Sequence, residues 1–234
     1  MDGISLVLPV FNEEDNLETA AQHIEVALKG IMPKYEVIIV DDGSTDKTGR
    51  IADNLARKSS HIRVIHQRNT GVGRALVAGF RATRYGFVTH NSADLPFDTS
   101  ELGNILPMFD SRTDIVVVVR KDRSANTLYR KITSWGNNLI IRFLFNIHIK
   151  DINFVQVYRK NVLDAIKVEA RDLFIPPELV IKALAKGCGI KQYVTTFYPR
   201  KKGEAKYGKP KQILTTFTDQ LRFWWKWRIL KQID

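Results

Sequence analysis

The sequence predicts an α/β fold with a mostly parallel central sheet flanked by helices. The chain has 234 residues, enough for one substantial domain with a core of its own. Short apolar runs alternate with segments of helical periodicity through the first half of the chain. Polar and glycine-rich residues directly follow several of these runs, at the position where such sheets bind their ligands.

Five apolar runs in the first half are predicted strands, and a predicted helix separates each from the next. The strands are expected at Ile4–Val10, 36–40, Ile62–His66, 86–89 and 114–119. The helices are expected at residues 13–28, 45–57, 73–83 and 100–109. A repeated strand–helix–strand order implies right-handed crossovers, so the strands run parallel and their carboxyl ends meet at one edge.

The second half of the chain is less regular. Further strands are expected at residues 154–158 and 190–196, and helices within 124–145, at 177–186 and at 216–230. A basic, glycine-containing loop at 199–210 separates the last strand from the last helix. We therefore expect one α/β domain over residues 1–210, followed by a C-terminal amphipathic helix within 211–234.

Composition indicates a globular protein with anionic partners. The chain carries 36 Lys and Arg against 25 Asp and Glu, a formal net charge of +11. Few aromatic residues lie between the basic residues in the basic stretches of the chain. The net charge is therefore the only indication of a nucleic-acid partner, and we do not expect one. The single cysteine, Cys188, excludes an internal disulfide and agrees with a reducing compartment. Because no apolar run reaches the roughly 20 residues of a membrane span, we expect a cytoplasmic protein that is at most peripheral to a membrane.

Two adjacent carboxylates follow the second predicted strand. Val40 ends this apolar run, and Asp41 and Asp42 come directly after it. Carboxylates at a strand end suit hydrogen bonds to ribose hydroxyls or base edges. Ordinary turn and capping chemistry explains residues 43–46 but not the pair of aspartates, so a binding role is favoured for Asp41 and Asp42.

Two further polar segments follow the third and fourth predicted strands. Gly71 and Arg74 belong to a glycine-containing loop before a helix, which suits either a phosphate contact or a simple turn. Ser92 and Asp94 lie two residues apart, just beyond a short strand. Asp94 is a candidate ligand for Mg²⁺ or Mn²⁺, which need hard oxygen ligands and often bridge a diphosphate.

Asp151 and two basic stretches complete the candidate residues. A lone Asp between a helix and a strand is usually structural or solvated, and only its context makes Asp151 a candidate general base. Clustered Arg and Lys side chains are usually solvated surface charges, but they also suit the binding of a phosphate leaving group or acceptor. The two stretches contain Arg120, Lys121, Arg123, Arg130 and Lys131, and Arg200, Lys201, Lys202, Lys206, Lys209 and Lys211.

The last predicted helix is basic, apolar at helical spacing and rich in tryptophan. That composition is typical of an interfacial membrane helix. It equally suits a helix that packs on the core of the same protein or on a partner subunit. Its apolar positions are Ile213, Leu214, Phe217, Leu221, Trp224 and Trp225.

Taken in order, these segments resemble glycosyltransferase family 2, and within it the dolichyl- and polyprenyl-phosphate sugar synthases such as dolichol-phosphate mannosyltransferases. The resemblance covers most of the chain and implies a GT-A, Rossmann-like fold. The family's nucleotide-binding, glycine-loop and metal segments are matched by Pro9, Phe11 and Glu13, by Val40, Asp41 and Asp42, by Gly71 and Arg74, and by Ser92 and Asp94. Its acceptor side is matched by Asp151, by Glu178, and by Arg200 and Lys206, which stand where the family grips the lipid phosphate.

Four positions depart from the family pattern. Ser92 replaces the first Asp of the Asp-x-Asp metal motif, and Pro96 stands where a Gln is often found. Gln156 stands where an Arg is often seen, and Ala205 replaces a Ser. The first two departures remove candidate metal ligands.

The resemblance implies an inverting transfer of a mannose- or glucose-type sugar from a GDP- or UDP-sugar to a polyprenyl or dolichyl phosphate. Catalysis would involve Asp94 and Asp151, with Asp94 on a Mg²⁺ or Mn²⁺ ion. Arg120 and Arg130 would help to neutralise the leaving diphosphate. The reaction would take place on the cytoplasmic face of a membrane, where a membrane-anchoring protein is a further candidate partner.

Two alternatives remain open from the sequence. One is a glycosyltransferase that acts on a soluble or glycan hydroxyl and therefore needs a firm general base. The other is a catalytically impaired homologue that binds nucleotide sugars without turnover, an interpretation motivated by Ser92 and Pro96.

Overall fold

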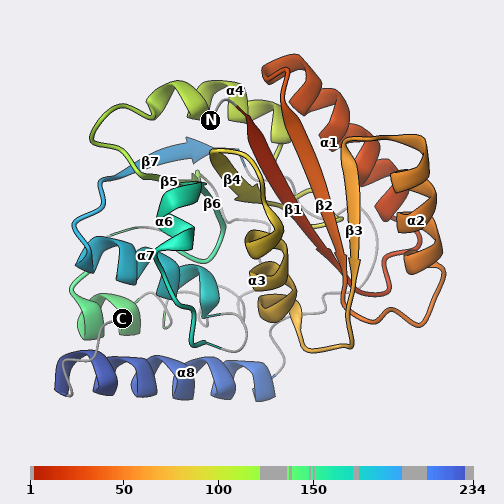
Figure 1. Ribbon diagram of the computed structural model, residues 1–234. Coiled ribbons are helices and arrows are strands. Elements are labelled where there is room, and N and C mark those ends of the chain that lie inside the picture. Colours follow the sequence, from red (N-terminus) through yellow and green to blue (C-terminus); the bar gives the residue numbers. More distant parts are fainter. Residues whose placement is uncertain are drawn as a thin grey trace.

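A computed structural model describes residues 3–121, 136, 139–147, 149, 151–170, 174–196 and 210–229, with the side chains of 210–214 and 229 left aside. Within these residues, seven strands form one sheet in the order β3-β2-β1-β4-β6-β5-β7 (Figure 1). The strands are β1 Ile4–Val10, β2 Tyr35–Asp41, β3 Ile62–His66, β4 Phe87–His90, β5 Ile115–Arg120, β6 Val155–Arg159 and β7 Ile190–Thr195.

The mostly parallel sheet expected from the sequence is confirmed. Parallel pairs join β1 to β2 and β4, β2 to β3, and β5 to β7. Strand β6 lies between β4 and β5 and runs antiparallel to both. As a result β6 begins at the edge where the other strands end, and the residues that precede β6 join that edge.

Most helices lie near the predicted positions, but the short helix at 160–164 was not predicted, the last helix begins six residues earlier than expected, and the helix expected within 124–145 falls partly outside the described residues. The helices are α1 Leu17–Ile31, α2 Thr48–Lys58, α3 Val72–Ala82, α4 Leu102–Ile105, α6 Lys160–Asp164, α7 Ile175–Ala185 and α8 Pro210–Trp224, with short turns η1 Thr99–Glu101, η2 Leu106–Met108 and η3 Trp225–Ile229. The helix expected at 100–109 is broken into three pieces, and Pro107 lies in the last of them, where it cannot donate a helical hydrogen bond. Helix α1 begins at Leu17 instead of residue 13 because the preceding residues bond to a neighbouring loop.

The sheet is covered on both faces. One buried apolar cluster joins alternate strand residues such as Leu6 to α1 and α2, and the other joins the intervening residues such as Val7 to α3 and α7. This two-sided burial explains why the central strands read as continuous apolar runs. Gly79 of α3 packs so closely on β1 that an added Cβ would overlap the side chain of Val7.

The C-terminal helix α8 lies at one end of the molecule, next to α7 (Figure 1). Within the part of the chain that the structure describes, no helix is both long and apolar enough to cross a membrane.

Candidate functional site

The candidate residues that the structure describes lie mainly at one edge of the sheet. Strands β1 to β4 are parallel, and β5 runs in the same direction because both β4 and β5 pair antiparallel with β6. Their carboxyl ends therefore carry Phe11, Asp41, Asp94 and Arg120 to the same edge, where ligands of open α/β sheets bind. The reversed strand β6 adds Asp151 from its amino end.

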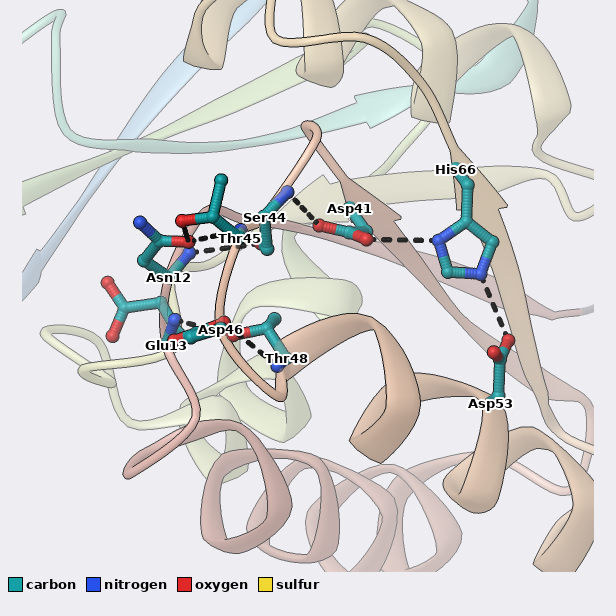
Figure 2. Close-up of polar contacts among 9 residues, drawn as sticks. All are labelled: Asn12, Glu13, Asp41, Ser44, Thr45, Asp46, Thr48, Asp53 and His66. Carbon is teal, nitrogen blue, oxygen red and sulfur yellow. Dashed lines mark hydrogen bonds and ion pairs between the residues drawn. The ribbon is translucent and has the colours of Figure 1, made fainter.

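Hydrogen bonds join the loop after β1 to the loop after β2 (Figure 2). The backbone N–H of Asn12 donates to Ser44 Oγ at 3.0 Å, and Asn12 Oδ1 accepts the N–H of Thr45 at 2.8 Å. The N–H of Glu13 donates to Thr48 Oγ1 at 2.8 Å. Asn12 has a φ of 52°, a left-handed conformation that Asn tolerates better than most residues. These bonds hold the loop that carries Phe11 and Glu13 against the loop that follows Asp41 and Asp42.

Both aspartates are buried and anchored by protein groups. Asp41 Oδ1 accepts the N–H of Ser44 at 3.0 Å, and its Oδ2 lies 3.0 Å from Nδ1 of His66. The carboxylate of Asp42 accepts the N–H groups of Thr70 at 2.9 Å and Gly71 at 2.8 Å. Asp42 therefore organises the glycine loop, a role that the sequence analysis did not assign to it.

The glycine loop leads directly into α3. Gly71 has a φ of 94°, a conformation that L side chains rarely adopt, and it precedes the first residue of the helix. Arg74 lies in the first turn of α3 and is exposed. A helix N-terminus with an arginine in its first turn is suited to an anionic group. Pro9 and Val40 lie at the ends of their strands, the first half-buried and the second buried.

Ser92 and Asp94 form a tight turn after β4. The hydroxyl of Ser92 donates to Asp94 Oδ1, and Ala93 between them is buried in the core. The side-chain amide of Asn91 donates to the carbonyl oxygen of Phe97 at 2.9 Å, which closes the loop. Asp98 caps the next helical turn by accepting the N–H of Ser100. Asp98 is thus engaged in local structure.

Arg120 and Asp151 form a bidentate ion pair. Arg120 Nε lies 2.6 Å from Asp151 Oδ2, and Nη2 lies 2.6 Å from Oδ1. The backbone N–H of Arg120 also donates to Oδ2 at 3.2 Å. The guanidinium carbon lies 4.6 Å from the ring centroid of Phe154. Asp151 is only 2% exposed and has a left-handed φ of 57°. This geometry suits the positioning of Arg120 better than the removal of a proton.

A buried polar network lies behind the pair. Gln156 is fully buried, and its Oε1 accepts hydrogen bonds from His90 Nε2 at 3.1 Å and Tyr158 Oη at 3.3 Å. Its Nε2 donates to the carbonyl oxygen of Ile152 at 2.6 Å. Burial lowers the pKa of His90, which is therefore neutral and donates through Nε2. Gln156 thus fixes the turn that carries Asp151, at a position where the family often has Arg.

Glu178, which the family resemblance places on the acceptor side, is anchored by groups of the protein itself. It is fully buried in the first turn of α7 and accepts the backbone N–H groups of Glu169 at 2.8 Å and Ala170 at 2.7 Å. Its Oε1 also lies 3.2 Å from Nζ of the buried Lys182. Burial raises the pKa of Glu178. These contacts support a role in holding the 165–170 segment on α7.

The remaining basic candidates, Arg130, Arg200 and Lys206, lie outside the described residues.

Helix α8 and the turn after it pack on the core through one side. Trp227 stacks on Phe145 at a centroid distance of 5.3 Å, Phe223 packs against the same ring at 5.6 Å in a tilted arrangement, and Lys226 pairs with Glu169. A second set of apolar side chains, spaced four residues apart, is exposed to solvent. We call this set the outer apolar stripe; it consists of Phe217, Leu221 and Trp225, which are 39%, 40% and 55% exposed.

The α/β fold places acidic side chains and an anchored arginine at the carboxyl edge of its sheet, which is where open α/β sheets bind their ligands. Residues 5–166 match glycosyl transferase family 2, and the chain belongs to this family.

Two curated relatives are polyprenyl-phosphate sugar transferases. The chain is 29% identical over 210 residues to the dodecaprenyl-phosphate galacturonate synthase of Rhizobium johnstonii, covering 88% of this chain and 62% of that protein. It is 31% identical over 177 residues to the undecaprenyl-phosphate 4-deoxy-4-formamido-L-arabinose transferase of Pseudomonas fluorescens, covering 74% of this chain and 52% of that protein. The chain thus spans less than two thirds of the length of these relatives.

Solved structures share the GT-A fold. Glucosyl-3-phosphoglycerate synthase from Mycobacterium tuberculosis in complex with UDP matches with a TM-score of 0.69 and 17% identity, over 95% of this chain and 80% of that one. The same enzyme with Mn²⁺, UDP-glucose and phosphoglyceric acid matches with a TM-score of 0.67 and 18% identity, over 94% and 80%. At this level of identity the likeness concerns the fold.

Proposed function

We propose that the protein is an inverting glycosyltransferase that moves a sugar from a nucleoside diphosphate sugar to a polyprenyl phosphate. The observation that carries this proposal is the convergence of Asp41, Asp94 and the Arg120–Asp151 pair on one edge of the sheet. Family membership and the names of the two curated relatives support the reaction class and the acceptor. The reaction forms a bond between an acceptor phosphate oxygen and the anomeric carbon, and it breaks the bond from that carbon to the diphosphate.

Each group at the edge has a distinct part in this proposal. Asp41 binds the ribose or base from its anchored position, next to Phe11 and Glu13. The N-terminus of α3 and Arg74 face the diphosphate. Arg120, held in place by Asp151, helps to neutralise the charge that develops on the leaving group. A phosphate acceptor is already anionic at neutral pH, so the transfer needs little general-base help, in agreement with the engagement of both Asp151 oxygens by Arg120.

A divalent cation is part of the proposal. Asp94 would hold a Mg²⁺ or Mn²⁺ ion, which supplies charge neutralisation to a bound diphosphate. The candidate ligand atoms near Asp94 are oxygens, which such ions prefer. Mg²⁺ often binds through one or two carboxylates plus substrate phosphates. Among the described residues no group of three or more His, Cys, Asp or Glu side chains is arranged to hold a metal alone. We therefore expect the ion to bind together with the nucleotide.

A membrane surface supplies the acceptor in this proposal. The acceptor side would involve Arg200 and Lys206, with the C-terminal segment over residues 211–234 as an interfacial helix on the cytoplasmic face of the membrane. The outer apolar stripe supports this role, because a basic helix with exposed Phe, Leu and Trp side chains suits the lipid headgroup boundary. A membrane-anchoring protein is a further partner that the proposal admits.

A donor and acceptor panel tests the proposal. Purified protein is incubated with undecaprenyl phosphate or with a soluble sugar acceptor, and with radiolabelled GDP-mannose, UDP-glucose, UDP-galacturonate or UDP-4-deoxy-4-formamido-L-arabinose, each with Mn²⁺, Mg²⁺ or a chelator. The proposal expects a lipid-linked sugar phosphate from at least one donor. The sequence favoured mannose or glucose, and the names of the relatives add the other two sugars. Transfer to a soluble hydroxyl acceptor but not to the lipid would favour the first alternative above. Nucleotide binding without transfer to any acceptor would favour the second.

A further inference from the structure

His66, the last residue of β3, bridges two carboxylates that come from different elements (Figure 2). Its Nδ1 lies 3.0 Å from Oδ2 of Asp41, at the end of β2, and its Nε2 lies 3.0 Å from Oδ1 of Asp53 in α2. Ionised carboxylates only accept hydrogen bonds, so both ring nitrogens must donate. A ring that donates from both nitrogens is an imidazolium ion, and its positive charge matches the two acids that it joins.

The surroundings of His66 favour this charged form. Hydrogen bonds to Asp53 and then to Asp41 raise the pKa of His66 above its ordinary value of 6.5, and they outweigh the opposing effect of burial. Asp41 from β2 and Asp53 from α2 are the charged groups in contact with the ring. Helix α2 also carries Arg50 and Arg57 on either side of Asp53 in the sequence, and Arg57 donates to Asn54.

Gly49 makes room for the pair formed by Asp41 and His66. A Cβ at Gly49 would lie 2.9 Å from Asp41 Oδ2 and 3.6 Å from His66 Cε1. Glycine is less favourable than alanine in a helix, and Gly49 lies in the first turn of α2. The absence of a side chain here lets the helix approach the imidazole and the carboxylate together.

We propose that His66 is a positioning residue for nucleotide recognition, because its imidazolium holds the carboxylate of Asp41 in the orientation that binds the ribose or base. The role rests on the proposed function, in which Asp41 contacts the nucleotide. The N–H of Ser44 fixes one oxygen of Asp41 and His66 fixes the other. With both oxygens anchored, the carboxylate cannot rotate, and its remaining lone pairs keep a constant direction.

The proposal makes nucleotide affinity depend on pH in a defined direction. Below the pKa of His66 in the folded protein the ring donates to both carboxylates. As the pH rises through that pKa, the ring loses one N–H and can donate to only one of the two carboxylates. Asp41 then loses its anchor in part of the molecules, so the affinity for nucleotide falls with rising pH. We expect a fall on the order of fivefold, the size of one modest hydrogen bond.

The experiment combines ring NMR with nucleotide titration on the full chain. Two-bond ¹H–¹⁵N spectra follow the protonation of His66 without nucleotide, and calorimetry gives the affinities for UDP and GDP from about pH 6 to 9. The variants are His66→Gln, which keeps one donor, and Asp53→Asn, which removes the outer carboxylate. The matched control is His61→Gln at the other end of β3, where the ring stacks on Tyr35 and contacts its carbonyl oxygen.

The expected result has three parts. His66 titrates above pH 6.5, and wild-type affinity falls over the same interval. Asp53→Asn moves both midpoints to lower pH, and His66→Gln binds about fivefold more weakly below the wild-type midpoint and without the pH dependence. His61→Gln behaves like the wild type.

Wild-type affinity that does not change with pH, or an Asp53→Asn midpoint that does not move, would overturn the role of His66. If the wild type binds neither nucleotide at any pH, the proposed function itself fails, and the role of His66 fails with it. The ring titration distinguishes this case, because it reports the bridge between the two carboxylates without nucleotide.

Discussion

Replacing Asp151 by Asn removes the charge that holds Arg120 in place. The carboxylate is buried and accepts three hydrogen bonds from Arg120, two from the guanidinium and one from the backbone. Asn keeps a single acceptor oxygen and turns an NH₂ group toward a guanidinium that also donates. Loss of one partner from a buried pair costs about 3–5 kcal/mol. Because Arg120 retains some exposure, with a side chain 17% accessible, we expect the lower end of this range, about 3 kcal/mol.

The same change should slow transfer. Arg120 without its anchor no longer points in one direction, and misplacement of a stabilising group by about 1 Å can cost 100-fold in rate. We expect a loss of roughly 10- to 100-fold in kcat with polyprenyl phosphate as acceptor. Urea unfolding measures the stability, and initial rates under conditions where the variant remains folded measure the transfer.

Asp164→Asn is the matched control, because Asp164 pairs with Lys160 on the surface of α6 at 2.6 Å. Removal of such a pair changes stability by less than about 0.5 kcal/mol and should leave transfer unchanged. If Asp151→Asn is as stable and as active as the wild type, the anchoring of Arg120 has no role in the fold or in the reaction.

Three further predictions concern other parts of the structure. Gly79→Ala should destabilise the protein by about 1–3 kcal/mol in urea unfolding, because the new Cβ overlaps Val7; an unchanged midpoint would contradict the close packing of α3 on β1. Asp42→Asn should weaken UDP or GDP binding measured by calorimetry, because the loop at Gly71 loses its ionised acceptor; unchanged affinity would remove that loop from the site. Polar replacement of the outer apolar stripe should reduce sedimentation with anionic lipid vesicles while the melting temperature stays within a few degrees, and undiminished sedimentation would exclude the stripe as the lipid contact.

Much of the fold follows from local pattern. The predicted strands Ile4–Val10 and Ile62–His66 match the structure, and the other predicted strand boundaries lie within one residue of it. The sequence identifies such strands because a strand that is buried on both faces is continuously apolar. The direction of β6 was not predicted, since a strand of five residues carries no information about its neighbours in the sheet.

The candidate site could be predicted only in part, because its contacts join residues that lie far apart in the sequence. The sequence placed Arg120 and Asp151 as separate candidates, and their pairing depends on the antiparallel β6 inserted between β4 and β5. The bridge made by His66 joins residues 25 and 13 positions away, which no local spacing indicates. The only available signal was a histidine at the end of one predicted strand and an aspartate directly after the preceding predicted strand.

The burial of Glu178 was not predicted from the sequence, and its role on the acceptor side stays a prediction. A glutamate in the first turn of a helix is normally exposed, and family resemblance placed it on the acceptor side. The structure buries it against Lys182 and two backbone N–H groups. The two backbone N–H groups come from Glu169 and Ala170 in a different segment, and residue type alone does not reveal such partners.

The most direct test of the central claim is the formation of a lipid-linked sugar phosphate by the purified chain. The assay uses undecaprenyl phosphate in detergent, a nucleoside diphosphate sugar and Mn²⁺, with the wild type compared with Asp94→Asn. The account predicts product with inverted configuration at the anomeric carbon and a rate at least about 100-fold lower in the variant. Tight binding of the nucleotide without lipid-linked product from any donor would contradict it.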